Sequence, residues 1–266
     1  MLSLGLQLAL SGGAALAVMM FFLWLLSVRL NNAGFVDVGW SLGLVILAVW
    51  YGWQGPGFAT RRWLMAAMVT FWGLRLALHL IRRIAAEPED GRYQQLRREW
   101  AGKNVSLRFL FFFEFQALLD VLLSMPMLLA ALNPLPHLSP LEYAGVALWV
   151  VAVVGESVAD AQLAAFKRNT ANRGHVCQQG LWRYSRHPNY FFEWFIWVAW
   201  LVYALASPWG WVSIVCPALM LFFLFRVTGI PATEAQALRS RRQEYARYQQ
   251  TTSAFVPWFP KSQPGA

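Results

Sequence analysis

Apolar residues dominate seven long stretches of the chain, and polar clusters separate several of them. Each stretch holds about 20 residues, the length that a helix needs to cross the hydrocarbon core of a membrane. The predicted spans cover residues 5–28, 34–54, 62–82, 107–132, 141–165, 189–206 and 209–230. Turn-forming residues lie between spans at 55–57, 133–140 and 207–210. We therefore expect an all-α integral membrane protein with a single domain over residues 1–266, in which Pro126 and Pro217 can kink two of the spans.

The composition fits a chain that has lipid as part of its solvent. Hydrophobic residues make up 58% of the 266 residues and charged residues only 13%, whereas soluble domains average about 25% charged residues. No basic segment precedes the first apolar stretch, so we interpret that stretch as a retained span and not as a signal peptide. Cys177 and Cys216 are too few for a disulfide framework, and we expect free thiols. The four histidines are dispersed, so we expect no metal site.

The net charge of +9 is concentrated at one side of the predicted spans. Lysine and arginine crowd residues 82–108, 166–188 and 239–261, while the loops at 133–140 and 207–210 contain neither. Loops with an excess of these cations face the cytoplasm. The pattern predicts a cytoplasmic C-terminus and, with seven spans, an N-terminus outside. Arg61 and Arg62 lie on the opposite side and violate this pattern.

Several ionisable residues interrupt the apolar spans, and most of them lie near the predicted cytoplasmic ends. Arg75 and His79 are four residues apart, so they share one face of a helix. Charged groups inside a membrane are costly and normally face a partner or a ligand. Ion pairs between helices, such as Arg75 with Asp37 or Arg226 with Asp160, are one interpretation. A cavity that opens to the cytoplasm and has a cationic rim explains the clustering better.

Such a cavity suits an anionic cofactor together with a lipid-like substrate. Arginine side chains match phosphate oxygens in a bidentate fashion. Asp160, Asn189 and Glu193 lie further in, and these groups suit a carboxamide or ribose hydroxyls. The chain has neither a P-loop nor a glycine-rich dinucleotide motif after a strand, which argues against a soluble nucleotide-binding fold. Basic residues flank membrane spans, so we expect no binding of nucleic acid.

Five segments resemble a known family. They read "DAQLAAFKRNTANRGHVCQQGLWRYSRHPNYFFEW" at 160–194, "YARYQQTTSAFVPWFP" at 245–260, "VDVGWSLG" at 36–43, "WGLRLALHL" at 72–80 and "DGRYQQLRREW" at 90–100. Together they resemble the membrane steroid 5-alpha-reductase superfamily, in particular its bacterial branch. No single segment is specific, but the combined pattern is, and it covers nearly the whole chain.

This resemblance implies an enzyme with seven membrane helices and an NADPH site that faces the cytoplasm. The family transfers a hydride to the carbon–carbon double bond of an enone in a steroid-like lipid, as in the 5-alpha-reduction of 3-oxo-4-ene steroids. It further implies a multi-pass monomer of the bacterial inner membrane that contacts membrane lipid.

The resemblance also implies a set of cofactor-binding residues. Asp160, Lys167, Asn189 and Glu193 match family residues that line the cofactor site. By hypothesis, the phosphates lie against Arg83, Lys167, Arg168 and Arg186. The full predicted set is Arg75, His79, Arg83, Asp160, Lys167, Arg168, Tyr184, Arg186, His187, Asn189, Glu193, Arg226 and Tyr248.

The predicted catalytic residues are Asp37, Trp72 and Glu193, and here the chain departs from the family pattern. Steroid-reducing members have a Gln-Glu pair in the second span and a tyrosine in the third, where this chain offers Asp37, Trp40 and Trp72. The family glycine before the sixth-span glutamate is Phe192. We expect Asp37 to donate a hydrogen bond to the substrate carbonyl, because a carboxyl in a dry pocket can stay neutral.

Two other functions remain open. The "RHPNY" motif and the C-terminal segment also resemble isoprenylcysteine carboxyl methyltransferases, which use S-adenosylmethionine. Those enzymes are expected to keep a Glu-Glu pair before the final tyrosines, where this chain reads "ATEAQALRSRRQEY". A lipid-binding or transport protein with a proton relay is the third interpretation. No inverted repeat supports transport.

Overall fold

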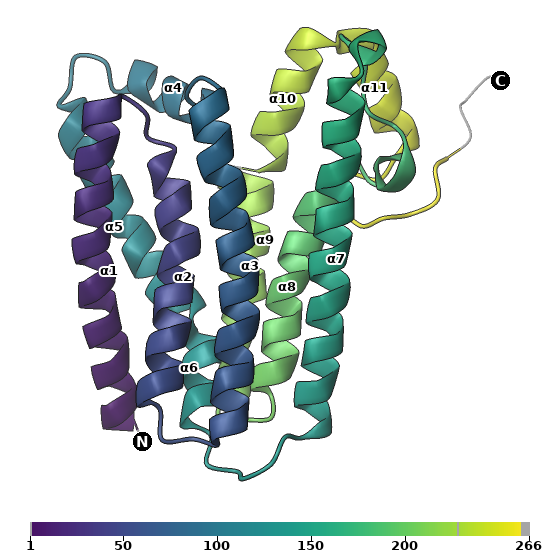
Figure 1. Cartoon of the computed structure of the whole chain (residues 1–266). Coiled ribbons are helices and arrows are strands. Elements are labelled where there is room, and N and C mark those ends of the chain that lie inside the picture. The colour runs from purple at the N-terminus through teal and green to yellow at the C-terminus, as the bar shows by residue number, and fades with distance from the viewer. Residues whose placement is uncertain (1, 228, 262–266) are drawn as a thin grey trace. The chain divides into compact units, whose positions relative to one another are not determined.

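The computed structural model describes residues 2–227 and 229–261, and 79% of the chain is helical, with no strand in the described part (Figure 1). Among the described residues, six helical segments are long and apolar enough to cross a membrane: Ser3–Leu30, Phe35–Gln54, Ala59–Ala86, Val105–Leu132, Pro140–Arg168 and Gly210–Ser240. The prediction of an all-α protein is thereby confirmed, and the six segments are consistent with the predicted multi-pass membrane protein. The remaining predicted span, 189–206, coincides with a helix of 17 residues, Pro188–Ala204. The count of seven spans and the orientation stay predictions.

The chain forms two compact units, which we describe separately. The first comprises residues 1–142 and 203–213, and the second comprises residues 143–202 and 214–266. The prediction of a single domain over residues 1–266 therefore stays a prediction.

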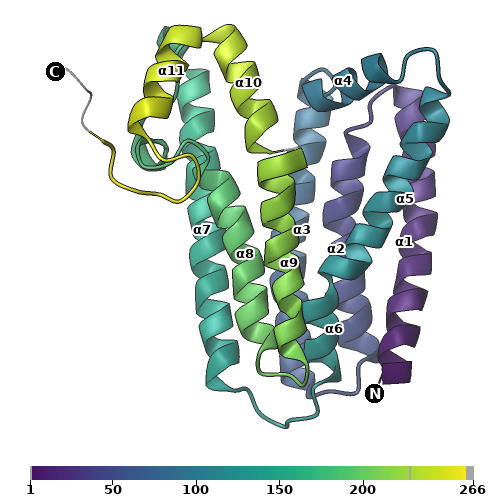
Figure 2. The same ribbon diagram turned by 180° about the vertical axis from the view of Figure 1, so that it is seen from behind.

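In the first unit, four membrane-type segments run alongside one another (Figures 1 and 2). They are α1 (Leu2–Leu30), α2 (Phe35–Gln54), α3 (Ala59–Ala86) and the pair α5 (Val105–Leu123) and α6 (Met125–Leu132). Helix α2 is the central element, because it contacts α1, α3, α5 and α6. Its residues Leu44, Leu47 and Tyr51 are almost fully buried. A short helix, α4 (Gly91–Glu99), connects α3 to α5 at one end of the unit.

The predicted kink at Pro126 is confirmed as a break between α5 and α6 at Ser124. Pro126 lies in the first turn of α6, where a missing N–H removes no helical hydrogen bond. The Ser124 hydroxyl, at the break, lies 3.1 Å from the Tyr51 hydroxyl of α2. At the break, the Ser124 hydroxyl therefore lies inside the unit, where Tyr51 of a second helix forms a hydrogen bond with it.

A carboxyl group lies buried near the middle of the fourth span. Asp120 of α5 is fully buried, and neither of its carboxyl oxygens has a hydrogen-bond partner among the described residues. The Asp120 side chain fills the space where Gly43 of α2 would carry a Cβ atom. A side chain at position 43 would therefore push α2 and α5 apart.

Arg61, which violated the charge pattern, is an internal structural residue of the first unit. Its guanidinium is fully buried and pairs with the equally buried Glu142. It also donates hydrogen bonds to the backbone carbonyls of Asn133, Leu135 and His137. Because a carboxylate and three carbonyls satisfy it, Arg61 carries no information about which side of the membrane is cytoplasmic.

The second unit contains α7 (Pro140–Arg168) from residue 143 onward, α8 (Pro188–Ala204) and α9 (Val215–Phe222), followed by a π-helical turn (Phe223–Val227). Two further helices, α10 (Ile230–Ser240) and α11 (Arg242–Thr251), then precede an extended C-terminal segment. Pro217, the second predicted kink site, lies in the first turn of α9, directly after a 3-10 turn (Gly210–Ile214). Cys177 and Cys216 are buried free thiols, as predicted.

Phe192 has a structural counterpart on α7. Its ring occupies the space where a Cβ atom of Gly155 would lie, so the two helices approach closely at this point. The departure from the family glycine before the sixth-span glutamate is thus accompanied by a glycine on the neighbouring helix.

Candidate functional site

The predicted site residues divide between the two units. Asp37, Trp72, Arg75, His79 and Arg83 belong to the first unit, and the other predicted residues belong to the second. Each set is therefore described by itself.

In the second unit, α7 and α8 bring two predicted cofactor-binding residues together. The Asn189 side-chain amide, in the first turn of α8, donates a hydrogen bond of 3.3 Å to the Asp160 carboxylate on α7. The Asn189 carbonyl oxygen is buried and accepts no hydrogen bond from the described residues. A buried acceptor without a partner is unusual in a folded protein. The pair therefore offers an open acceptor to a ligand with N–H or O–H groups.

Arg186, predicted to bind phosphate, is occupied by the protein itself. Its guanidinium lies 2.7 Å from the Glu234 carboxylate of α10 and donates to the backbone carbonyls of Gln249 and Thr252. The side chain is only 10% exposed. In this arrangement Arg186 joins the start of α8 to the C-terminal helices, and it has little capacity left for a phosphate.

Glu234 is the centre of this contact, which we call the Glu234 cluster: Arg186, His187, Glu234, Tyr245 and Gln249. The same carboxylate lies 3.3 Å from His187 Nε2, 3.3 Å from the Tyr245 hydroxyl and 2.8 Å from the Gln249 amide. Burial, together with the nearby Glu234 charge, raises the pKa of Tyr245 above its usual value, so it remains a neutral donor. The cluster therefore holds α10 and α11 against the residues that precede α8.

Two predicted cofactor-binding tyrosines also have structural contacts. The Tyr248 hydroxyl is buried and donates to the backbone carbonyls of Trp182 and Ser185. The Tyr184 carbonyl accepts from the Trp258 backbone N–H at 2.9 Å, and the Tyr184 ring packs edge-on against Phe259. Both residues thus fix the chain around the "RYSRHPNY" motif.

The remaining predicted residues of the second unit are more accessible. Lys167 and Arg168 are exposed in the last turn of α7, where cations complement the negative end of the helix dipole. Arg226 is exposed in the π-helical turn, and Glu193 is half-buried on α8. Lys167 and Arg168 remain the candidates of this unit for an anionic ligand.

In the first unit, Asp37 contacts two residues of the short helix α4. Its carboxylate accepts a hydrogen bond of 2.6 Å from the Tyr93 hydroxyl and one of 3.1 Å from the Arg92 guanidinium. Both oxygens therefore act as acceptors in this structure, and the predicted role of Asp37 as a hydrogen-bond donor to the substrate stays a prediction. Tyr93 is buried, and burial together with the Asp37 charge raises its pKa well above the usual value.

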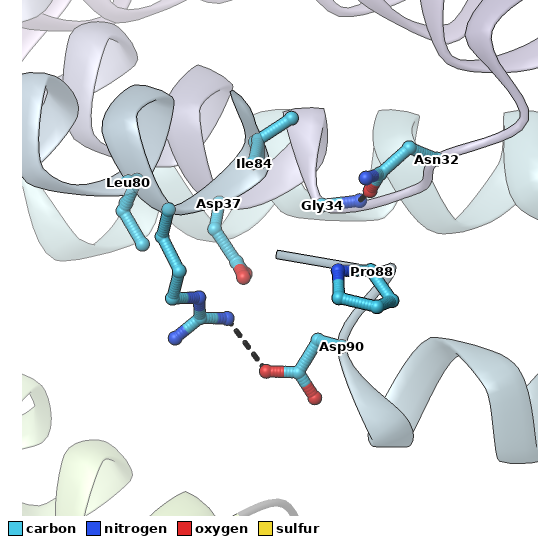
Figure 3. Close-up of a pocket in the computed structure, with 8 residues that line it drawn as sticks. Asn32, Gly34, Asp37, Leu80, Ile84, Pro88 and Asp90 are labelled. Carbon is cyan, nitrogen blue, oxygen red and sulfur yellow. Dashed lines mark hydrogen bonds and ion pairs between the residues drawn. The ribbon is translucent and has the colours of Figure 1, made fainter. Parts of the chain in front are cut away.

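The other contacts of α4 complete what we call the α4 cluster: Asp37, Arg83, Asp90, Arg92 and Tyr93. The Asp90 carboxylate caps α4 by accepting from the Arg92 backbone N–H, and it lies 2.6 Å from the Arg83 guanidinium. Burial opposes the ionisation of Asp90, but hydrogen bonds and the charges of Arg92 and Arg83 outweigh it and lower its pKa. Asp37 and Asp90 line a small recess, which Figure 3 shows. Its volume is about 10 Å³, which is roughly the space of one water molecule.

The three other predicted residues of the first unit lie along α3. Trp72 is fully buried and packs edge-on against Trp40, at a centroid distance of 5.8 Å. Arg75 is half-buried and His79, one turn later, is exposed. Their predicted roles stay predictions.

Sequence reasoning missed Glu234, Arg92, Tyr93 and Asp90. Asp90 precedes a short polar stretch, so the N-cap preference for aspartate could have indicated the start of α4. No local signal marks Glu234, because Arg186 and His187, which it binds, lie 48 and 47 residues earlier in the chain.

The comparison with known proteins agrees with the resemblance at the level of the family. Residues 23–252 match the model of a family described as protein of unknown function (DUF1295), which is related to the steroid 5-alpha-reductases. Comparison with curated proteins and with solved structures found no match. The matched segment contains every predicted site residue, from Asp37 to Tyr248, and it covers most of the 266 residues. The chain therefore belongs to the DUF1295 family.

Proposed function

We propose that the protein is a membrane reductase that uses NADPH to saturate the carbon–carbon double bond of an enone in a steroid-like lipid. The observation that carries the proposal is the contact of Asp160 with Asn189 and the buried Asn189 oxygen without a partner. A carboxamide N–H or a ribose hydroxyl supplies the donor that this oxygen lacks. The relation of the family to steroid 5-alpha-reductases supports the same chemistry.

The positions along α7 fit an elongated anionic cofactor. Lys167 lies seven residues after Asp160, which is about two turns, so both side chains are on one side of α7 at a separation of about 10 Å along the axis. Asp160 and Asn189 then bind the polar end of the cofactor, while Lys167 and Arg168 face its phosphates. Arg186 is left out of this assignment, because Glu234 occupies it.

The cofactor, when bound, supplies a hydride to the β carbon of the enone, and a proton is added at the α carbon to complete the saturated ketone. Asn189 and Asp160 orient the donor end of the cofactor through hydrogen bonds. Apolar side chains of a lipid-facing site exclude water and so favour electrostatic stabilisation of the charge that develops on the carbonyl oxygen.

The role of Asp37 changes in this proposal. Because both of its oxygens accept hydrogen bonds from Tyr93 and Arg92, we assign Asp37 to the positioning of α4.

The proposal is tested by ligand binding to purified protein in detergent. NADPH is expected to raise the thermal unfolding temperature of the protein. Asn189→Ala is expected to weaken NADPH binding about tenfold, because it removes the buried amide oxygen that accepts a hydrogen bond from the cofactor. Gln178→Ala, which removes an exposed amide, is the matched control. A 4-ene-3-keto steroid should then consume NADPH and yield the saturated ketone.

The same assay separates the reductase from the methyltransferase. Stabilisation by S-adenosylmethionine and not by NADPH contradicts the reductase and favours the methyltransferase. Unchanged NADPH affinity in both Asn189→Ala and Asp160→Asn removes the assigned cofactor site even if turnover is found.

A further inference from the structure

We propose that the C-terminal segment Thr251–Lys261 forms a binding groove for an anionic phospholipid, with an acyl chain along Trp258 and Phe259 and the phosphate at Lys261. This site is separate from the proposed cofactor residues and does not depend on the reductase function.

The groove has the size and the lining of a ligand site. Its volume is about 460 Å³, within the range of typical small-molecule pockets. Its walls are Val256, Trp258 and Phe259, and its polar groups are Thr251, Ser253 and Lys261. Apolar walls with a few polar groups are the composition expected for an amphiphilic ligand.

The segment is fixed in place and is not a loose tail. The backbone N–H groups of Trp258 and Lys261 donate to the carbonyls of Tyr184 and Thr251, at 2.9 and 2.8 Å. The Ser253 carbonyl accepts from the Arg186 N–H at 2.9 Å. Pro257 further restricts the backbone. The groove is therefore formed before any ligand binds, which lowers the entropic cost of binding.

The segment has one buried aromatic side chain and two exposed ones. Phe255 is buried against Phe191, Trp194 and Phe225. In contrast, Trp258 and Phe259 are 70% and 76% exposed, and their rings pack edge-on. Two adjacent exposed aromatic rings on a fixed backbone mark an interaction surface. Tryptophan is also enriched at the boundary between lipid and water.

The charges around the groove select an anionic head group. None of the six lining residues is acidic, and Lys261 is exposed at the edge. Arg247 lies one turn before Thr251 on α11, and Arg183 directly precedes Tyr184; both are exposed. An apolar wall with Lys261 at its edge complements a lipid with a phosphate head group and not a neutral sterol.

The test measures the quenching of tryptophan fluorescence by brominated lipids. Wild type and Trp258→Phe are reconstituted with brominated phosphatidylglycerol or brominated phosphatidylcholine, and the difference between the two proteins isolates the Trp258 signal. We expect phosphatidylglycerol to quench Trp258 at a lower mole fraction than phosphatidylcholine. Lys261→Gln should weaken the phosphatidylglycerol effect about fivefold, which corresponds to about 1 kcal/mol per cation near an anionic surface.

Two controls and two outcomes decide the proposal. Trp211→Phe isolates another exposed tryptophan, which should not distinguish the two lipids, and Arg239→Gln removes an exposed cation outside the groove. Equal quenching of Trp258 by both lipids, unchanged in Lys261→Gln, means that the rings lie at the interface without selecting a head group, and it overturns the proposal. No quenching by either lipid overturns it as well.

Discussion

The two charged clusters of the first unit differ in how completely the protein surrounds them. Arg61 and Glu142 have side-chain exposures of 0% and 1%, and backbone carbonyls satisfy the remaining donors. In the α4 cluster, Arg92 and Asp37 are 39% and 23% exposed. The first pair lies in a medium where an unpaired charge is very costly, while water screens the second.

This difference shows that residue type does not reveal the role of a membrane arginine. Arg61 looked like an error in the charge pattern, and Arg186 looked like a phosphate ligand. Both are internal contacts, and Glu142 and Glu234 explain them. A ligand role is better argued from a polar atom that the protein leaves unsatisfied, as at Asn189.

The largest loss of stability is expected when the Arg61–Glu142 pair is broken. Glu142→Gln leaves the guanidinium buried without a counter-charge, which typically destabilises a protein by 3–5 kcal/mol, so we expect a loss of about that size. Thermal and chemical unfolding in detergent measure it. Glu87→Gln removes an exposed carboxylate and is the control. If both variants unfold at the same temperature, the contrast between the two clusters is wrong.

An intermediate effect is expected for the Glu234 cluster, in which Arg186 and Glu234 are 10% and 15% exposed. Glu234→Gln removes the charge that Arg186 and His187 share, and we expect a loss of about 1–3 kcal/mol because charged hydrogen bonds are weakened. Hydrogen exchange should become faster in α10 and α11. Arg239→Gln on α10 should leave exchange unchanged, and slow exchange in both variants would contradict the role of the cluster.

A smaller effect is expected at Asp37. Asp37→Asn weakens the contacts with Arg92 and Tyr93, and the partial exposure of this pair limits the loss of stability to about 1 kcal/mol. Faster hydrogen exchange should be confined to α4. Loss of turnover without any change in α4 would instead support the original hypothesis that Asp37 is the proton donor.

The smallest effect is the pH dependence of Asp90. Because folding lowers its pKa, the Asp90 carboxylate stabilises the fold above its unfolded-state pKa, and this contribution is lost as the pH falls through the folded pKa. We expect wild type to be more stable than Asp90→Asn at pH 6 and the difference to shrink toward pH 3. The thermal unfolding temperatures of the two proteins at both pH values measure this. A difference that grows on acidification contradicts the sign.

Six of the seven predicted spans coincide with long apolar helices, because apolar stretches of sufficient length need no partner to be recognised. The break at Pro126 and the approach of Asn189 to Asp160 also follow from local signals and from the family resemblance. The short helices α4, α10 and α11 were not predicted. Short polar helices are marginal alone and depend on tertiary contacts, here with Asp37, Arg186 and His187.

Long-range ion pairs were the other part that sequence patterns could not supply. Arg61 and Glu142 are 81 residues apart, and Arg186 and Glu234 are 48 residues apart. The distribution of charge along the sequence placed Arg61 in a loop and Arg186 at a ligand. Neither Glu142 nor Glu234 lies at a helical spacing from its arginine, so the sequence did not indicate the ion pairs. Only the packing of the helices shows which cations are already neutralised.

The buried carboxyl of Asp120 has a consequence for biosynthesis. It lies near the centre of the segment Val105–Leu132, where an aspartate disfavours insertion into a bilayer by about 2.5–3.5 kcal/mol. Leucine and phenylalanine neighbours must outweigh this penalty as the segment leaves the translocon. In the folded protein Gly43 of α2 leaves the space that the carboxyl occupies, so a bulkier residue at position 43 would displace an acidic group that has already entered the membrane.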